Sequence, residues 1–131
     1  MEFVMSYNLK LETKIDVAVK RWKSVEKKKM FGGVCYLIKG NMSFGIWKDS
    51  LIVRMEKESA GKSLAIRNVG PFAVTGKPMA GWILVAEAGW KGPAALEKWI
   101  NIGKKFALSL PEKKLKIRTT KTLREYKINI R

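Results

Sequence analysis

Apolar residues recur every three or four positions near the start of the chain, and lysines occupy most of the positions between them. The apolar positions are Leu11, Ile15, Ala18, Val19 and Trp22. This spacing places them on one face of a helix, with most charged residues outside that face. Asn8, just ahead of the stripe, is a residue type that caps helix N-termini. The pattern therefore predicts an amphipathic helix over residues 8–23.

The next part of the chain consists of short apolar runs, rich in β-branched and aromatic residues, with turn residues between them. The runs cover residues 34–38, 42–47 and 51–55. The connections Gly40-Asn41 and Lys48-Asp49 are too short to join anything except antiparallel neighbours. We therefore predict a three-stranded antiparallel meander.

Less regular segments flank this meander. Before it, residues 27–31, which begin with three lysines, are predicted to be extended. Gly32-Gly33 predict a bulge or bend ahead of the first strand. After it, residues 56–66 predict a short helix. Two further strands are predicted at about residues 71–75 and 81–87.

The last helix has the clearest signals. Pro93 follows Gly92 at a first-turn position, and Pro111 ends the segment. Its buried face is predicted to be Leu96, Trp99, Ile100, Gly103, Phe106, Ala107 and Leu110. Because Gly103 has no side chain, it should let this helix approach the sheet closely.

The elements follow the order α-β3-α-β2-α. Helices cannot lie between consecutive antiparallel strands, so they should gather on one face of a single sheet. We predict a two-layer α+β domain over residues 7–111, with an antiparallel sheet of about five strands.

A basic tail, residues 112–131, follows this domain. Apolar residues alternate with polar ones in it, as they do in strands. They are Leu115, Ile117, Tyr126, Ile128 and Ile130. A hairpin added to a sheet edge, in the same protomer or a partner, competes with a mobile basic arm. The clean alternation favours the ordered hairpin.

Composition agrees with a single domain in a reducing compartment. The chain has 131 residues, of which 47% are hydrophobic, enough for one core. Cys35 is the single cysteine and cannot form an intramolecular disulfide. We find no secretion signal and no apolar run of membrane-spanning length, so a cytoplasmic location without membrane contact is expected.

Most enzyme classes lack their residues in this chain. There is no histidine, which excludes Ser-His and Cys-His pairs and histidine-containing zinc sites. Residues 51–63 imitate a strand leading into a phosphate-binding loop, but Glu56 stands where that loop needs its first glycine. We therefore expect no enzyme activity, no cofactor and no metal. A deep cleft that gathered Asp49, Arg54, Lys77 or Glu87 would change this expectation.

Charge is the strongest compositional signal. The chain has 27 Lys and Arg against 11 Asp and Glu, a formal net charge of +16. Such a field attracts polyanions and acidic partners. The excess is greatest per residue in the first thirty residues and after residue 111. A solubilising surface would give the same composition, so charge alone does not assign nucleic-acid binding.

Two blocks of residues resemble the N-terminal domain of the TfoX/Sxy family of competence regulators. The first block comprises Met30-Phe31-Gly32-Gly33, Gly40-Asn41-Met42, Lys48-Asp49 and Leu51-Ile52-Val53-Arg54. The second comprises Phe72, Thr75-Gly76-Lys77-Pro78-Met79 and Gly81-Trp82-Ile83-Leu84-Val85. Trp99-Ile100 and Ser109-Leu110-Pro111 continue the match, which covers about residues 7–111.

The resemblance implies a two-layer α+β fold like that of type III secretion chaperones, with the order derived above. Longer members carry a C-terminal helical domain and help the cyclic-AMP receptor protein at competence promoters. In this chain a basic tail stands where that domain would be. The family's N-terminal domain has no established catalytic residues to carry over.

Two functional hypotheses follow. The first is a non-enzymatic interaction module in gene regulation that acts through a protein partner, and a homodimer is compatible with it. The second is direct nucleic-acid binding without sequence specificity, through cations that contact phosphates. Its candidate residues are Lys27, Lys28, Lys29, Arg54, Lys77, Lys113, Lys114, Lys116 and Arg118.

Overall fold

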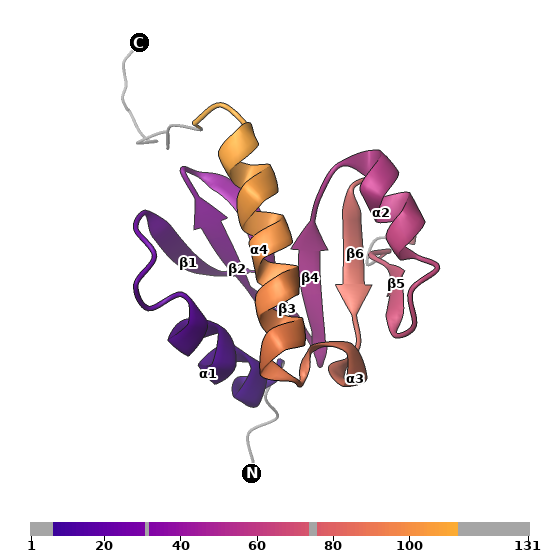
Figure 1. Ribbon diagram of the computed structural model, residues 1–131, viewed down its shortest axis with the longest axis horizontal. Helices are drawn as coiled ribbons and strands as arrows, with labels where there is room; N and C mark the ends of the chain where they lie inside the picture. Colours follow the sequence, from indigo (N-terminus) through magenta and orange to yellow (C-terminus); the bar gives the residue numbers. More distant parts are fainter. Residues whose placement is uncertain (1–6, 31, 74–75, 113–131) are drawn as a thin grey trace.

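The computed structural model describes residues 7–30, 32–73 and 76–112, which form one sheet and four helices (Figure 1). The strands are β1 (Val25–Met30), β2 (Gly33–Ile38), β3 (Asn41–Trp47), β4 (Ser50–Arg54), β5 (Val69–Pro71) and β6 (Trp82–Val85). The helices are α1 (Leu9–Ala18), α2 (Lys57–Ser63), α3 (Glu87–Trp90) and α4 (Pro93–Ser109). The tail beyond residue 112, with its predicted hairpin, lies outside the described residues.

The sheet is antiparallel throughout, in the order β1-β2-β3-β4-β6-β5. Helices α1 and α4 cover one of its faces, with α4 crossing in front of β3 (Figure 1). The predicted α+β class, the antiparallel sheet and the helical layer are therefore confirmed. The sheet has six strands in the described residues rather than about five, because the basic segment before Gly33 pairs with β2 along its whole length.

Two boundaries differ from the predicted ones, and one helix is additional. Helix α1 ends at Ala18 rather than residue 23, because the chain must turn at Ser24 (φ 61°) to enter β1. Trp22 still packs on the core, but from the turn after the helix. Strand β5 begins at Val69, earlier than expected, and the short helix α3 was not predicted at all.

Tight turns set the register of the meander. Lys39 and Gly40 both have positive φ between the paired residues Ile38 and Asn41, as a two-residue type I′ hairpin requires. The turn is therefore one residue earlier than predicted. At the next hairpin Lys48 has a φ of 56°, and this turn lies where the sequence placed it.

The core lies between the sheet and α1 and α4. Leu11 and Ile15 of α1 are fully buried in this core, and so is Ile100 of α4. At Gly103 a Cβ atom would lie 2.4 Å from the carbonyl oxygen of Ser43 in β3, so a larger residue cannot fit without movement. The predicted close approach of helix and sheet at Gly103 is confirmed.

Asn8 joins the start of α1 to the sheet. Its side-chain oxygen accepts a hydrogen bond from the backbone N–H of Leu11 (2.8 Å), as an N-cap does. Its amide nitrogen donates to Asp49 (3.0 Å), which lies in the turn between β3 and β4. One side chain thus starts the helix and fixes it against the sheet.

Candidate functional site

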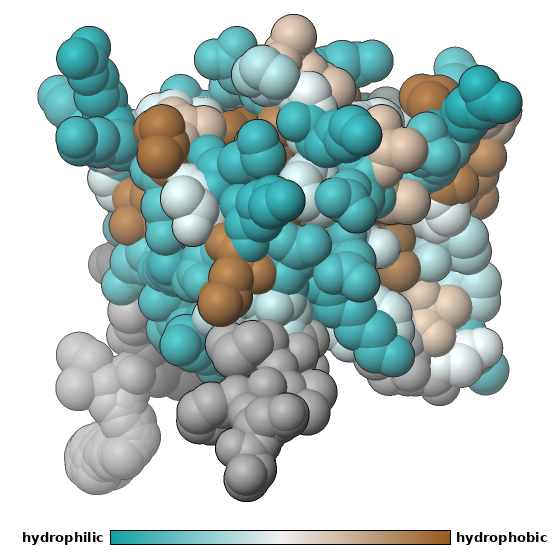
Figure 2. All heavy atoms as spheres, turned by 90° about the horizontal axis from the view of Figure 1, so that it is seen from below, coloured by the Kyte–Doolittle hydropathy of each residue, from teal (hydrophilic) through white to brown (hydrophobic). Residues whose placement is uncertain are grey.

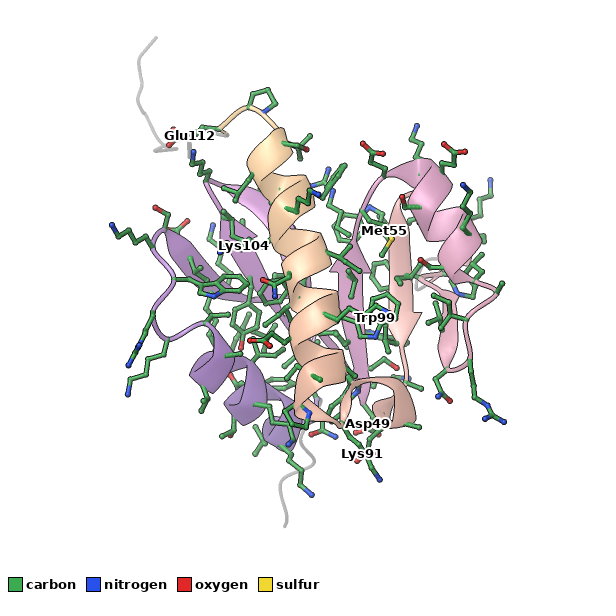
Figure 3. The ribbon with its side chains drawn as sticks, in the orientation of Figure 1. Asp49, Met55, Lys91, Trp99, Lys104 and Glu112 are labelled. Carbon is green, nitrogen blue, oxygen red and sulfur yellow. The ribbon has the colours of Figure 1, made fainter. Side chains whose placement is uncertain are left out.

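A groove runs between α2 and α4, beside the end of β4. It consists of two adjoining hollows of about 340 and 420 Å³ that share Met55, Glu56 and Phe106 in their walls. Figure 3 shows Met55 on the side of α4 that faces α2, whereas Lys104 lies on the opposite side of that helix. We call this hollow surface the α2–α4 groove. Its remaining lining residues are Arg54, Lys57, Glu58, Ser59, Ala80, Gly81, Trp82, Ile102, Lys105 and Ser109.

Arg54 lies close to two aromatic rings at the end of this groove. Its guanidinium carbon is 5.1 Å from the centroid of the Trp82 ring and 5.3 Å from that of Phe106. Trp82 starts β6, directly opposite Arg54 in the sheet register, while Phe106 comes from α4. Phe72 supports Trp82 from behind, with the ring centroids 6.0 Å apart. The side chain is therefore positioned by two strands and one helix.

The guanidinium has few partners of its own. Nη1 of Arg54 donates one long hydrogen bond, 3.4 Å, to the carbonyl oxygen of Met42. Within the part of the chain that the structure describes, no carboxylate forms an ion pair with it. Burial lowers the pKa of Arg54, but an arginine side chain keeps its charge at neutral pH. The groove therefore presents a half-buried cation that is not neutralised by the described residues.

The rest of the groove is mostly apolar near the cation. Met55 is buried and joins the core, while Ile102 and Phe106 of α4 are half-buried beside it. Lys57 and Lys105 add two positive charges to the rim, and Glu56 and Glu58 add two negative ones. This combination can hold a ligand that carries a negative charge next to an apolar group.

A family model for the TfoX N-terminal domain matches residues 18–107, well over half of the chain. The chain belongs to the TfoX N-terminal domain family. Membership indicates a domain of regulatory type and agrees with the resemblance found in the sequence. A search of curated proteins and a search of solved structures both find no significant match.

Lys27 of this TfoX N-terminal domain is occupied by internal ion pairs. Its ammonium lies 2.7 Å from a carboxylate oxygen of Glu12 and 2.8 Å from one of Asp16, both on α1. Burial alone would lower the pKa of Lys27, but the hydrogen bonds to Asp16 and Glu12 outweigh burial and raise it. This lysine joins α1 to β1, which reduces its availability to a phosphate.

The other predicted phosphate contacts are spread over the domain. Lys28 and Lys29 point to opposite faces of the edge strand β1, and Lys29 lies 6.0 Å from the ring of Tyr7. Lys77 lies between β5 and β6, the two strands at the far side of the sheet. Arg54 lies at the end of β4, in the α2–α4 groove. The described residues therefore do not bring these five cations together.

The remaining candidates of the nucleic-acid hypothesis are Lys113, Lys114, Lys116 and Arg118, which lie outside the described residues. The described residues therefore do not test whether the tail and the domain together form one surface for nucleic acid. Direct binding to nucleic acid stays a prediction.

Two of the groups named for a catalytic cleft, Asp49 and Arg54, are also separated. Asp49 and Arg54 lie at opposite ends of β4, about 16 Å apart from the rise per residue of a strand. Figure 3 places Asp49 beside Lys91, at the end of the domain away from Met55. Gly61, Lys62 and Ser63 form the last turn of α2, not a loop that leads into a helix. Over residues 7–30, 32–73 and 76–112, no three carboxylate or cysteine side chains come together as metal ligands.

Sequence reasoning named Arg54 but missed its surroundings. It treated this residue as one of several phosphate contacts and placed Phe106 in the buried face of the last helix. Phe106 is instead half-buried, because it lies at the edge of the α4 stripe and faces the groove. The sequence did offer one signal for this site, an arginine at the end of an otherwise apolar strand. In the structure this arginine is paired with Trp82 of β6.

No described helix is long and apolar enough to cross a membrane.

Proposed function

We propose that this domain is a non-enzymatic interaction module that binds a protein partner in the α2–α4 groove, in a regulatory role. The observation that carries the proposal is the state of Arg54. Its guanidinium lies close to the rings of Trp82 and Phe106, next to an apolar hollow, and no described carboxylate pairs with it.

A binding role accounts for this arrangement better than catalysis does. A half-buried arginine costs desolvation, so its retention without an internal partner suggests an external one. Arginine and aromatic residues are also the side chains that contribute most to protein interfaces. Two serines line the groove, and among the described residues the hydroxyl of Ser109 donates to the backbone oxygen of Phe106 (2.6 Å), whereas a hydrolytic nucleophile would be hydrogen-bonded to a base. The regulatory part of the proposal is supported by family membership.

Site-specific photo-cross-linking tests the proposal in the cells that make the protein. A photoreactive residue at Ser59 or Lys105 would face the groove, whereas one at Val17, exposed on α1, would not. We expect a cross-linked protein from the two groove positions, and its loss when Arg54→Ala is added. Equal cross-linking from Val17, or cross-linking to nucleic acid alone, would contradict the proposal.

Val17 is exposed on α1 and serves as a control position. Figure 2 shows the end of the domain that carries α1 and α3, where hydrophobic side chains form separate small patches among hydrophilic ones. Leu9 and Val17 are exposed apolar residues of α1. Patches of this size are ordinary for a monomeric surface and predict no partner.

A further inference from the structure

We infer that the α2–α4 groove recognises an acidic linear segment of the partner, in which a carboxylate side chain is followed by an apolar one. This inference rests on the proposed function and names the chemistry of its ligand. The carboxylate would bind Arg54, and the apolar side chain would enter the hollow formed by Met55 and Phe106.

The contacts of Arg54 determine which of its donors remain available. A guanidinium has five N–H donors, which lie in its plane and point outward from its edge. The rings of Trp82 and Phe106 lie close to the guanidinium and offer it no oxygen acceptor, and the long bond to Met42 uses one donor. The donors that remain suit the two oxygens of a carboxylate, which arginine binds in a bidentate manner.

The charges around Arg54 favour a carboxylate over a phosphate. Glu56 lines both hollows, so a dianionic phosphate would face its negative charge at short range. A carboxylate carries a single negative charge and meets less repulsion. Lys57 and Lys105 offset Glu56, while Glu58 is partly engaged by Lys62 at 3.8 Å. The rim is thus slightly positive, on a chain whose net charge is +16.

The apolar walls of the groove are the reason to expect an apolar side chain in the ligand, next to the carboxylate. Met55, Ile102 and Phe106 surround the smaller hollow, so a carboxylate alone would leave these side chains exposed to water. An apolar side chain next to the carboxylate would cover them and gain about 25 cal/mol for each Å² removed from water. Hollows of a few hundred Å³ suit one or two such side chains.

The test is a titration of the ¹⁵N-labelled full-length chain, followed by NMR. The probe is an acetylated and amidated pentapeptide, Ser-Asp-Leu-Phe-Ser. We expect the indole N–H signal of Trp82, assigned with a Trp82→Phe variant, to shift with a dissociation constant of about 10⁻⁵ to 10⁻³ M. A probe with Asn in place of Asp, or with Ser in place of Leu and Phe, should bind at least about tenfold more weakly.

Matched variants locate the site. Arg54→Lys keeps the charge but loses the planar fork, so binding should weaken about tenfold or more. Arg67→Lys makes the same change in an exposed turn outside the groove and should leave binding unchanged. If thermal unfolding shows that Arg54→Lys does not fold, Lys105→Gln serves as the test variant instead. It should weaken binding of the Asp-containing probe and leave binding of the Asn-containing probe unchanged.

The outcomes separate this inference from the function on which it rests. Inorganic phosphate that shifts Trp82 as strongly as the peptide would overturn the inference, since the site would then bind any anion. Cross-linking of a protein at Ser59 or Lys105 without any peptide response would overturn the acidic motif and leave the docking function standing. Absence of both responses would overturn both.

Discussion

Gly103 shows what a missing side chain contributes to the contact between α4 and the sheet. The position lies in the middle of α4, where alanine would favour the helix by about 1 kcal/mol over glycine. A Cβ atom there would nevertheless lie 2.4 Å from the backbone oxygen of Ser43, and 3.1 Å from its hydroxyl. Because the obstacle is mainly backbone, α4 would have to move away from β3.

We therefore predict that Gly103→Ala destabilises the domain, by about 1–3 kcal/mol, as overpacked cores commonly do. The measurement is urea unfolding followed by tryptophan fluorescence. Gly61→Ala is the matched control, because Gly61 also lies within a helix but a Cβ there meets nothing within 4 Å. That variant should be stabilised by about 0.5–1 kcal/mol. Equal effects of the two substitutions would mean that the contact with Ser43 is unimportant.

Ser43 itself has an unusual environment for a polar residue. Its hydroxyl is fully buried and has no hydrogen-bond partner in the described structure. It lies at an irregularity of the β2–β3 ladder, where the pairing shifts between Tyr36 and Leu37. Such a group costs free energy in the folded state.

At the level of elements, α1 is held to the sheet by a cluster of polar side chains. The hydroxyl of Tyr36 donates a hydrogen bond to Asp16 (2.7 Å), and Lys27 bridges Asp16 and Glu12. Burial raises the pKa of Tyr36, and the adjacent carboxylate of Asp16 raises it further. The folded state therefore keeps this hydroxyl protonated to a higher pH than the unfolded chain does.

This difference predicts how stability depends on pH. The contribution of Tyr36 is fully present below its unfolded pKa of about 10 and is lost as the pH rises above that value. Tyr36→Phe should cost about 1–2 kcal/mol near neutral pH, because the hydrogen bond to a carboxylate is lost. Above about pH 10 the gap between wild type and variant should shrink, by up to about 1.4 kcal/mol per pH unit.

Urea unfolding between about pH 8 and pH 11 measures this gap. All groups other than Tyr36 are the same in both proteins, so the difference between the two free energies of unfolding reports mainly on Tyr36. Lys27, whose pKa is also raised, likewise contributes less at high pH in both. A gap that stays constant across the range would show that the pKa of Tyr36 is not raised by folding.

The elements themselves were largely predictable from the sequence, because their signals are local. The periodic stripe of α4, the Pro93 at its start and the short hairpins of the meander all determine structure within a few residues. The end of α1 was not predictable in this way. Val19 and Trp22 continue the apolar stripe, but they reach the core from a turn that the entry into β1 imposes.

The candidate site was less predictable than the fold, since it depends on residues far apart in the chain. Arg54, Trp82 and Phe106 come from β4, β6 and α4, and only the strand order β4-β6 brings the first two together. The sequence indicated the arginine as a candidate, but it did not show that Trp82 and Phe106 lie next to it. Conversely, Lys27, Lys28 and Lys29 are adjacent in the sequence, but the alternation of β1 divides them between two faces.

At the scale of the whole molecule, the net charge of +16 still requires an account. Among the described residues, the predicted phosphate contacts lie at opposite edges of the sheet and in the groove. Much of the basic excess belongs to the tail, where residues 111–131 hold eight Lys and Arg against two acids. If this protein binds nucleic acid as well as a partner, the tail should supply much of the affinity.

We predict that any binding to a labelled duplex falls steeply with salt, by about 0.9 log units per log unit of salt for each phosphate neutralised. Replacing Lys113, Lys114 and Lys116 together with Gln should reduce that slope. Lys27→Gln should not, because Glu12 and Asp16 already neutralise this lysine. Lys28→Gln, on the adjacent residue and without an ion pair in the described structure, is the matched control.

Fluorescence anisotropy at two or more salt concentrations separates these cases. If Lys28→Gln reduces the salt dependence of binding and Lys27→Gln does not, then β1 contacts the duplex. The ion pairs of Lys27 with Glu12 and Asp16 would then persist in the complex. An equal reduction for both lysines would mean that phosphate displaces Glu12 and Asp16 from Lys27, and that the ion pairs are weak in solution. If the duplex does not bind even at low salt, the charge serves another purpose, and attraction of an acidic partner toward the α2–α4 groove becomes its best physical explanation.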